Sequence, residues 1–136
     1  MKKLHTVTAL IEAGAGVALM GFPSVAVKLL LGTPLDSAAA EVLGRLAGAA
    51  LFALGIACWL ASRDARSQAA RGLAAAMLFY NFAAVALFAL ARFGLGLQGV
   101  LLWPAVILHA VMTVWCIACL RCKPSNESVP NTGQKI

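Results

Sequence analysis

Apolar residues fill four runs of the chain, and short polar or glycine-containing segments separate these runs. The runs cover residues 4–22, 37–61, 72–91 and 100–120. Each has the roughly 17 to 25 residues that an α-helix needs to cross the hydrocarbon of a membrane. The pattern therefore predicts an all-α fold in which four transmembrane helices form a bundle.

A shorter apolar segment lies between the first two predicted helices. Residues 23–31 are too few to cross a membrane, and Pro23 and Gly32 bound them. We expect this segment to be an interfacial or re-entrant piece. Thr33 follows, with a proline and an aspartate close behind it, which is typical of a helix start. The second helix is therefore expected to begin with Thr33 as its cap.

The composition favours a membrane protein over a soluble one. Hydrophobic residues make up 62% of the chain and charged residues only 12%, which leaves too little polar surface to cover a soluble domain. The formal net charge of +6 would indicate nucleic acid as the partner of a soluble chain. Because the basic residues here lie between apolar runs, we expect membrane lipids as partners and no nucleic acid.

The basic residues also predict an orientation. The side of the four-helix path that holds both termini and residues 62–71 carries most of them: Lys2, Lys3, Arg63, Arg66, Arg71, Arg121, Lys123 and Lys135. By the positive-inside rule, both termini are expected to be cytoplasmic. We predict a multi-pass protein of the bacterial inner (plasma) membrane. Residues 1–122 would be its single transmembrane domain, and residues 123–136, which are polar and lack periodicity, a flexible tail.

The second run carries a row of small residues. Gly44, Gly48 and Gly55 fall on one face of a helix that turns by about 100° per residue. The first two form a GxxxG motif, the spacing that lets two backbones touch where lipid gives no hydrophobic drive for association. We expect this face to pack against another helix of the bundle or across a homodimer.

Polar side chains interrupt the other three runs at a common depth. Glu12, Asn81 and His109 each lie about 12 to 16 Å from the cytoplasmic end at 1.5 Å per residue. Thr8 shares a helix face with Glu12, and Thr113 shares one with His109. Ionisable residues at this depth are costly and usually face the bundle interior or a cavity. We predict a ligand-binding or proton-linked site here, with Glu12 protonated near neutral pH.

The group of polar side chains at this depth also has a structural interpretation, and the sequence leaves the choice open. Glu12, Asn81 and His109 would then only hydrogen-bond one another and fix the register of the helices.

A second polar feature lies near the outer end of the second run. Glu41 and Arg45, four residues apart there, are interpreted as an intrahelical ion pair at the outer mouth. The alternative for this pair is a site for an anionic headgroup or substrate.

No sequence feature predicts a metal, a cofactor or a catalytic site. Cys116, Cys119 and Cys122 resemble part of an iron–sulfur run, but the nearby fourth cysteine is missing. Residues three and six apart on a helix also spread over too wide an arc to converge on one metal. We expect free thiols. The sequence contains no nucleophile elbow, phosphate loop or paired-carboxylate pattern, so an enzyme is the less favoured interpretation.

Two resemblances carry these observations further. The stretch GRLAGAALFALGIACWLA at residues 44–61, preceded by LLLGTPLD at residues 29–36, resembles small bacterial four-helix membrane proteins of unknown function, loosely similar to the DoxX-like group. The likeness extends to about residue 121. Because its motifs are glycine and alanine patterns, it implies the fold and carries no chemistry over.

The second, weaker resemblance is to the small multidrug resistance transporters, short four-helix proteins with an essential glutamate in the first helix. The stretch Ala9-Leu10-Ile11-Glu12 stands at the corresponding place, so the resemblance implies a proton-linked role for Glu12 alone. The chain departs from that family in its strong charge bias and in the glycines of its first helix.

These features lead to two hypotheses of function. The favoured one is a non-enzymatic membrane protein that uses its glycine face and polar layer to bind an apolar or amphipathic ligand. In a variant of this hypothesis, it is an accessory subunit that binds a partner membrane protein, or it forms a homo-oligomer. The second hypothesis is a proton-coupled small-molecule transporter that uses Glu12. The sequence leaves the ligand, the partner and the oligomeric state open.

Overall fold

The computed structural model describes residues 1–121 of the chain, and within this range the protein is helical with no strand. The elements are α1 (Lys2–Gly21), α2 (Pro23–Leu31), α3 (Ala38–Arg63), α4 (Gln68–Ala89), the π-helical turn η1 (Leu90–Gly94) and α5 (Leu102–Arg121). The helices α1, α3 and α5 are long and apolar enough to cross a membrane, as is α4 together with η1. The predicted four-helix bundle with a short segment after its first helix is therefore confirmed, whereas the expected tail lies outside the described residues.

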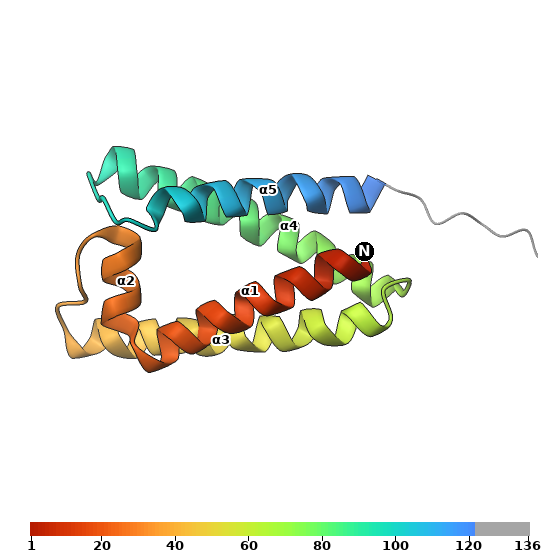
Figure 1. Ribbon diagram of the computed structural model, residues 1–136, viewed down its shortest axis with the longest axis horizontal. Helices are drawn as coiled ribbons and strands as arrows, with labels where there is room; N and C mark the ends of the chain where they lie inside the picture. The colour runs from red at the N-terminus through yellow and green to blue at the C-terminus, as the bar shows by residue number, and fades with distance from the viewer. Residues whose placement is uncertain (122–136) are drawn as a thin grey trace, which may run out of the picture.

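The long helices form two pairs. Helix α1 packs along α3, and α4 packs along α5, whereas contacts between the pairs are fewer (Figure 1). The N-terminus, the α3–α4 connection and the last turn of α5 lie at one end of the bundle, which we call the N-terminal end. Helix α2 stands across the opposite end, between α3 and the start of α5, and we call this the α2 end.

Glycines allow α1 and α3 to touch along their backbones. A Cβ atom added to Gly48 would lie 2.7 Å from the Met20 nitrogen and 2.8 Å from the Gly16 carbonyl oxygen. One added to Gly55 would lie 2.9 Å from the Ala13 nitrogen. Contacts this short leave no room for a side chain, so the two helix backbones can approach this closely because Gly48 and Gly55 have none.

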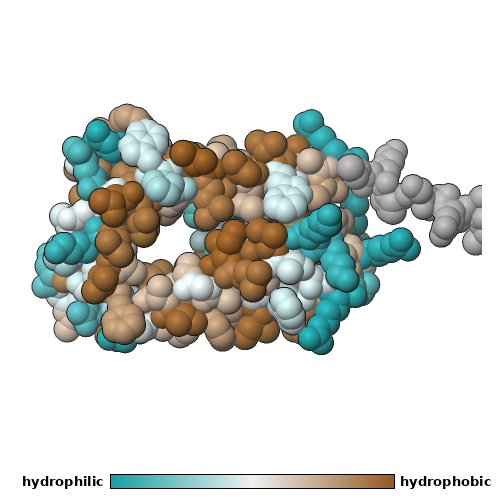
Figure 2. All heavy atoms as spheres, in the orientation of Figure 1, coloured by the Kyte–Doolittle hydropathy of each residue, from teal (hydrophilic) through white to brown (hydrophobic). Residues whose placement is uncertain are grey.

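The apolar core lies toward the N-terminal end. All four long helices contribute to one buried cluster, formed by Leu4, Ala9, Cys58, Ala74, Met77, Met112 and Cys116. At the other end the pairs are joined through α2, because the Gln98 and Leu101 nitrogens donate to the carbonyls of Leu31 and Leu29 at 3.1 and 2.9 Å. Between these two joints, Figure 2 shows an opening through the molecule, bordered by α1, α2 and α5.

The start of α3 differs from the prediction. Ser37, not Thr33, caps this helix, and its hydroxyl accepts from the Ala40 nitrogen at 3.1 Å. Gly32 ends α2 in the left-handed conformation with φ 89°, and the Leu35 nitrogen then donates to the Ser24 hydroxyl at 3.2 Å. The Gly32 conformation and this hydrogen bond hold the chain in a non-helical turn past Thr33. Expecting the cap there was wrong because a glycine stop and a contact with α2 outweigh the local signal.

Candidate functional site

Glu12 is a carboxyl group inside the bundle. It sits in the middle of α1 and is only 3% exposed. His5, Thr8 and Gly16 are also buried and lie on the same helix face, at spacings of one turn. The Tyr80 hydroxyl donates to the Glu12 carboxylate oxygen Oε2 at 3.5 Å, which is the one side-chain hydrogen bond of Glu12 within residues 1–121. A contact this long is weak, so the carboxyl keeps most of its capacity to bind another group.

Asn81 and His109 form a tight pair between α4 and α5. The Asn81 amide nitrogen donates to the Met77 carbonyl at 2.7 Å, which turns its oxygen toward His109. The His109 Nδ1 atom lies 2.8 Å from that oxygen and is therefore assigned as the donor. The other ring nitrogen, Nε2, is then left as an acceptor in the neutral imidazole.

Tyr80 connects these two groups. Its ring packs edge-on against the His109 imidazole, with centroids 5.7 Å apart, while its hydroxyl reaches Glu12. The Phe88 ring also packs against the imidazole, tilted by 45°, with the ring centroids 5.7 Å apart. The structure thus joins Asn81 directly to His109, whereas Glu12 reaches them only through Tyr80. We call Glu12, Tyr80, Asn81 and His109 the polar layer.

The two threonines predicted for this site have different surroundings. The Thr113 hydroxyl donates to the His109 carbonyl at 2.8 Å, one turn back on its own helix. Thr8 is 1% exposed and its hydroxyl has no partner within the described residues. The Thr113 hydroxyl is therefore bonded within the helix that carries His109, while Thr8 adds a hydroxyl without a partner in residues 1–121 to the helix face of Glu12.

The polar layer directly follows the buried apolar cluster on three helices. Glu12 comes three residues after Ala9 on α1, Tyr80 three after Met77 on α4, and His109 three before Met112 on α5. Three residues correspond to about 4.5 Å along a helix. In each case the step leads from the N-terminal end toward the α2 end, so the polar layer lies between the packed cluster and the opening of Figure 2.

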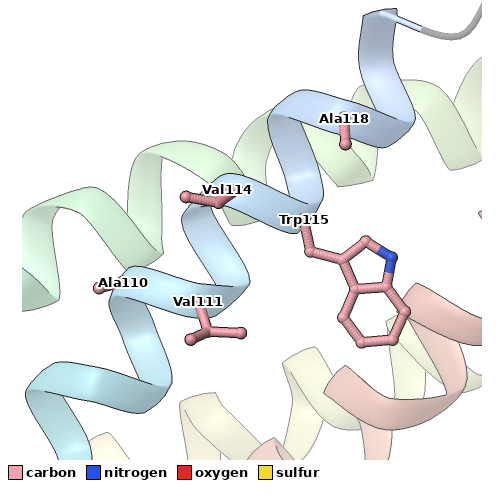
Figure 3. A pocket seen from close by; sticks show the side chains of 5 residues that line it. All are labelled: Ala110, Val111, Val114, Trp115 and Ala118. Atoms are coloured by element: carbon pink, nitrogen blue, oxygen red, sulfur yellow. The ribbon is translucent and has the colours of Figure 1, made fainter.

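An apolar groove runs along α5. It has a volume of about 430 Å³ and is lined by Ala110, Val111, Val114, Trp115 and Ala118. Figure 3 shows the Trp115 indole reaching from α5 toward α1, and all five lining residues belong to α5. Its walls are almost wholly apolar and offer contact to an alkyl chain or a ring, and the Trp115 indole N–H is the one hydrogen-bonding side-chain group among the lining residues.

The glycines and the expected outer ion pair also have clear positions. Gly48 and Gly55 face α1, while an added Cβ atom at Gly44 would approach the side chain of Pro23 in α2 at 3.1 Å. Arg45 does not pair with Glu41 in the described part of the chain. Its guanidinium donates instead to the Met20 carbonyl, since carbonyls in the last turn of a helix lack partners and carry partial negative charge.

Sequence reasoning missed Tyr80, Phe88 and the role of Gly16. Tyr80 is the only tyrosine of the chain and precedes Asn81 in an apolar helix, and a buried tyrosine hydroxyl needs a partner. That signal was available. Phe88 and Gly16 carry no such signal, because apolar and small residues are common throughout these helices.

No protein-family model, no curated protein and no solved structure matches this chain. Residues 1–121 also contain no group of three or more His, Cys, Asp or Glu placed to hold a metal ion, and Cys122 lies outside this range. In apolar surroundings, a carboxyl, a phenol and an imidazole can exchange hydrogen bonds or a proton with a ligand, and the carboxyl can pair with a cation.

Proposed function

We propose that this protein is a non-enzymatic integral membrane protein that binds an amphipathic molecule between its two helix pairs. The supporting observation is that the polar layer lies, along the helices, between the buried apolar cluster and the opening beside α2. A ligand that entered the opening from the membrane would meet apolar side chains first and would reach the Glu12 carboxyl and the Tyr80 hydroxyl further toward the N-terminal end.

The polar layer, more than the apolar walls, would set affinity and selectivity. Transfer of an alkyl chain from lipid tails to an apolar groove changes its free energy little, because lipid tails are as apolar as leucine. A polar group of the ligand gains more free energy on binding, since it finds a hydrogen-bonding partner that hydrocarbon does not offer. The expected ligand therefore carries a cationic or hydrogen-bond-donating group on an apolar body.

We further propose the bacterial inner membrane as the location, with both termini cytoplasmic. Support comes from the basic residues of the described chain that lie at the N-terminal end: Lys2, Lys3, Arg63, Arg66, Arg71 and Arg121. The opening would then face the outer half of the membrane. Labelling of a Ser67→Cys variant should reach residue 67 from the cytoplasmic side only, and labelling from outside would overturn this orientation.

Native mass spectrometry of protein purified in mild detergent tests the binding function. We expect the wild-type chain to retain an amphipathic molecule in stoichiometric amount, Glu12→Gln to lose most of it, and Glu41→Gln to keep it, since Glu41 is exposed. Equal retention by all three forms, or none by the wild type, would refute the proposal. A stoichiometric protein partner without such a molecule would instead support the accessory-subunit hypothesis.

Proton-coupled transport is the second candidate. The observation that favours it is that Glu12 is the one buried carboxyl within residues 1–121 and has one weak hydrogen bond there. Uptake of an organic cation into vesicles, driven by a pH gradient and abolished in Glu12→Gln, would support this candidate. If the protein binds the organic cation but a pH gradient drives no uptake of it, only the proposed binding function remains.

A further inference from the structure

Two side chains on α1 are buried without hydrogen-bond partners. His5 and Thr8 are each 1% exposed. Within the described residues, neither His5 ring nitrogen nor the Thr8 hydroxyl oxygen has a partner at normal hydrogen-bond geometry, although the backbone of Ala70 lies near the His5 ring. Buried polar atoms are nearly always bonded to protein or to ordered water, so three such atoms within one helical turn require an explanation.

The conformation of Thr8 shows that its hydroxyl is available. Thr6 on the same helix donates to the Lys2 carbonyl at 3.1 Å, and Thr113 donates to the His109 carbonyl at 2.8 Å. Both follow the usual pattern of a threonine in a helix, which bonds the carbonyl four residues earlier. Thr8 forms no such bond. Its hydroxyl therefore remains free to bind a group in the bundle interior.

From these atoms we infer that His5 and Thr8 hold internal water, and that this water connects Glu12 with the N-terminal end of the bundle. A neutral imidazole offers one donor and one acceptor, and a hydroxyl offers both. Together they supply the two to four polar partners that a buried water molecule needs. Glu12 lies one turn beyond Thr8 on the same face, which is within reach of a short chain of water molecules.

The other helices place few ionisable groups around this path. Cys58 of α3 and Cys116 of α5 are buried in the adjoining cluster, while Tyr80 and His109 belong to the polar layer. Arg71 at the start of α4 donates to the Leu120 carbonyl. The water would thus let a proton pass between Glu12 and the N-terminal end. This inference goes beyond ligand binding, because it concerns how the carboxyl exchanges its proton whether or not a ligand is present.

Infrared spectroscopy on membranes transferred to deuterated water tests the path. The rate of exchange of the Glu12 carboxyl proton is read from its carbonyl band, which Glu12→Gln identifies. We expect Thr8→Val to slow this exchange about tenfold, since it removes one hydrogen-bonding group from the path. The matched Thr6→Val should exchange at the wild-type rate. Equal rates in all three proteins would overturn the inference.

A second measurement on the wild-type chain covers the case in which Thr8→Val fails to fold. The chain has two histidines, so solid-state NMR of ring nitrogens can detect magnetisation transferred from water to each of them. A rapid transfer to the His5 ring is expected, and a His5 ring that receives none would contradict the inference. Ligand retention is measured separately, so the two proposals can fail independently.

Discussion

The contact between α1 and α3 and the contact between the two helix pairs are built in opposite ways. Along α1 and α3, glycines let backbone meet backbone, and there is no room for another atom at Gly16, Gly48 or Gly55. Between the pairs, an apolar cluster at one end and α2 at the other leave a polar layer and an opening in the middle. The first contact would hold the fold together, and the second would leave space for function.

Breaking the glycine contact should have the largest effect on stability. Gly48→Leu would force α1 and α3 apart, and we expect it to lower the free energy of unfolding by about 3 kcal/mol. Gly14→Leu is the control, because nothing lies within 4 Å of a Cβ atom at Gly14. Thermal unfolding in detergent compares the two. Equal melting temperatures would show that the glycine contact does not hold the helices together.

Thinning the apolar cluster between the pairs should have the next largest effect. Leu4→Ala leaves a cavity where all four long helices meet, and we expect a loss of about 2–3 kcal/mol. Leu10→Ala on the same helix is the matched control, since Leu10 is 65% exposed and Leu4 only 1%. Unfolding curves of the two variants in one detergent provide the measurement. A larger loss for Leu10→Ala would contradict the assignment of the core.

Removing the Asn81 amide from the polar layer should lower the free energy of unfolding by a smaller amount. Asn81→Leu deletes the bonds to the Met77 carbonyl and to His109, and a polar contact between membrane helices contributes about 1 kcal/mol. Unfolding measurements should show that loss. The NMR signal of His109 Nδ1 should shift as its acceptor disappears, and an unchanged signal would show that the pair is not formed.

Much of the fold could be predicted from the sequence, because a membrane sets the length and polarity of each spanning helix. The faces of α1, α4 and α5 that carry Glu12, Asn81 and His109 also follow from helical periodicity. The opening does not, since the tilt of one helix pair against the other depends on packing at both ends. The bond between Arg45 and Met20 was missed for a related reason, because it joins two helices whose relative position no local pattern specifies.

Removing the Tyr80 hydroxyl should have the smallest effect on stability. Tyr80→Phe keeps the ring against His109 and deletes only a 3.5 Å hydrogen bond, so we expect the free energy of unfolding to change by less than about 0.5 kcal/mol. Ligand retention should nevertheless fall, because the polar group of the ligand loses the Tyr80 hydroxyl as a hydrogen-bonding partner beside Glu12. A large loss of stability with unchanged ligand retention would show that the Tyr80 hydroxyl stabilises the fold and does not contribute to ligand binding.

The reaction of Glu12 with a membrane-soluble carbodiimide tests most directly whether the opening gives access from lipid to the polar layer. Such a reagent modifies protonated carboxyls that it can reach from the hydrocarbon, and mass spectrometry of peptides locates the product. The predicted result is modification of Glu12, slowed by the retained amphipathic molecule. A folded protein in which Glu12 stays unmodified, while the denatured chain reacts there, would contradict the account.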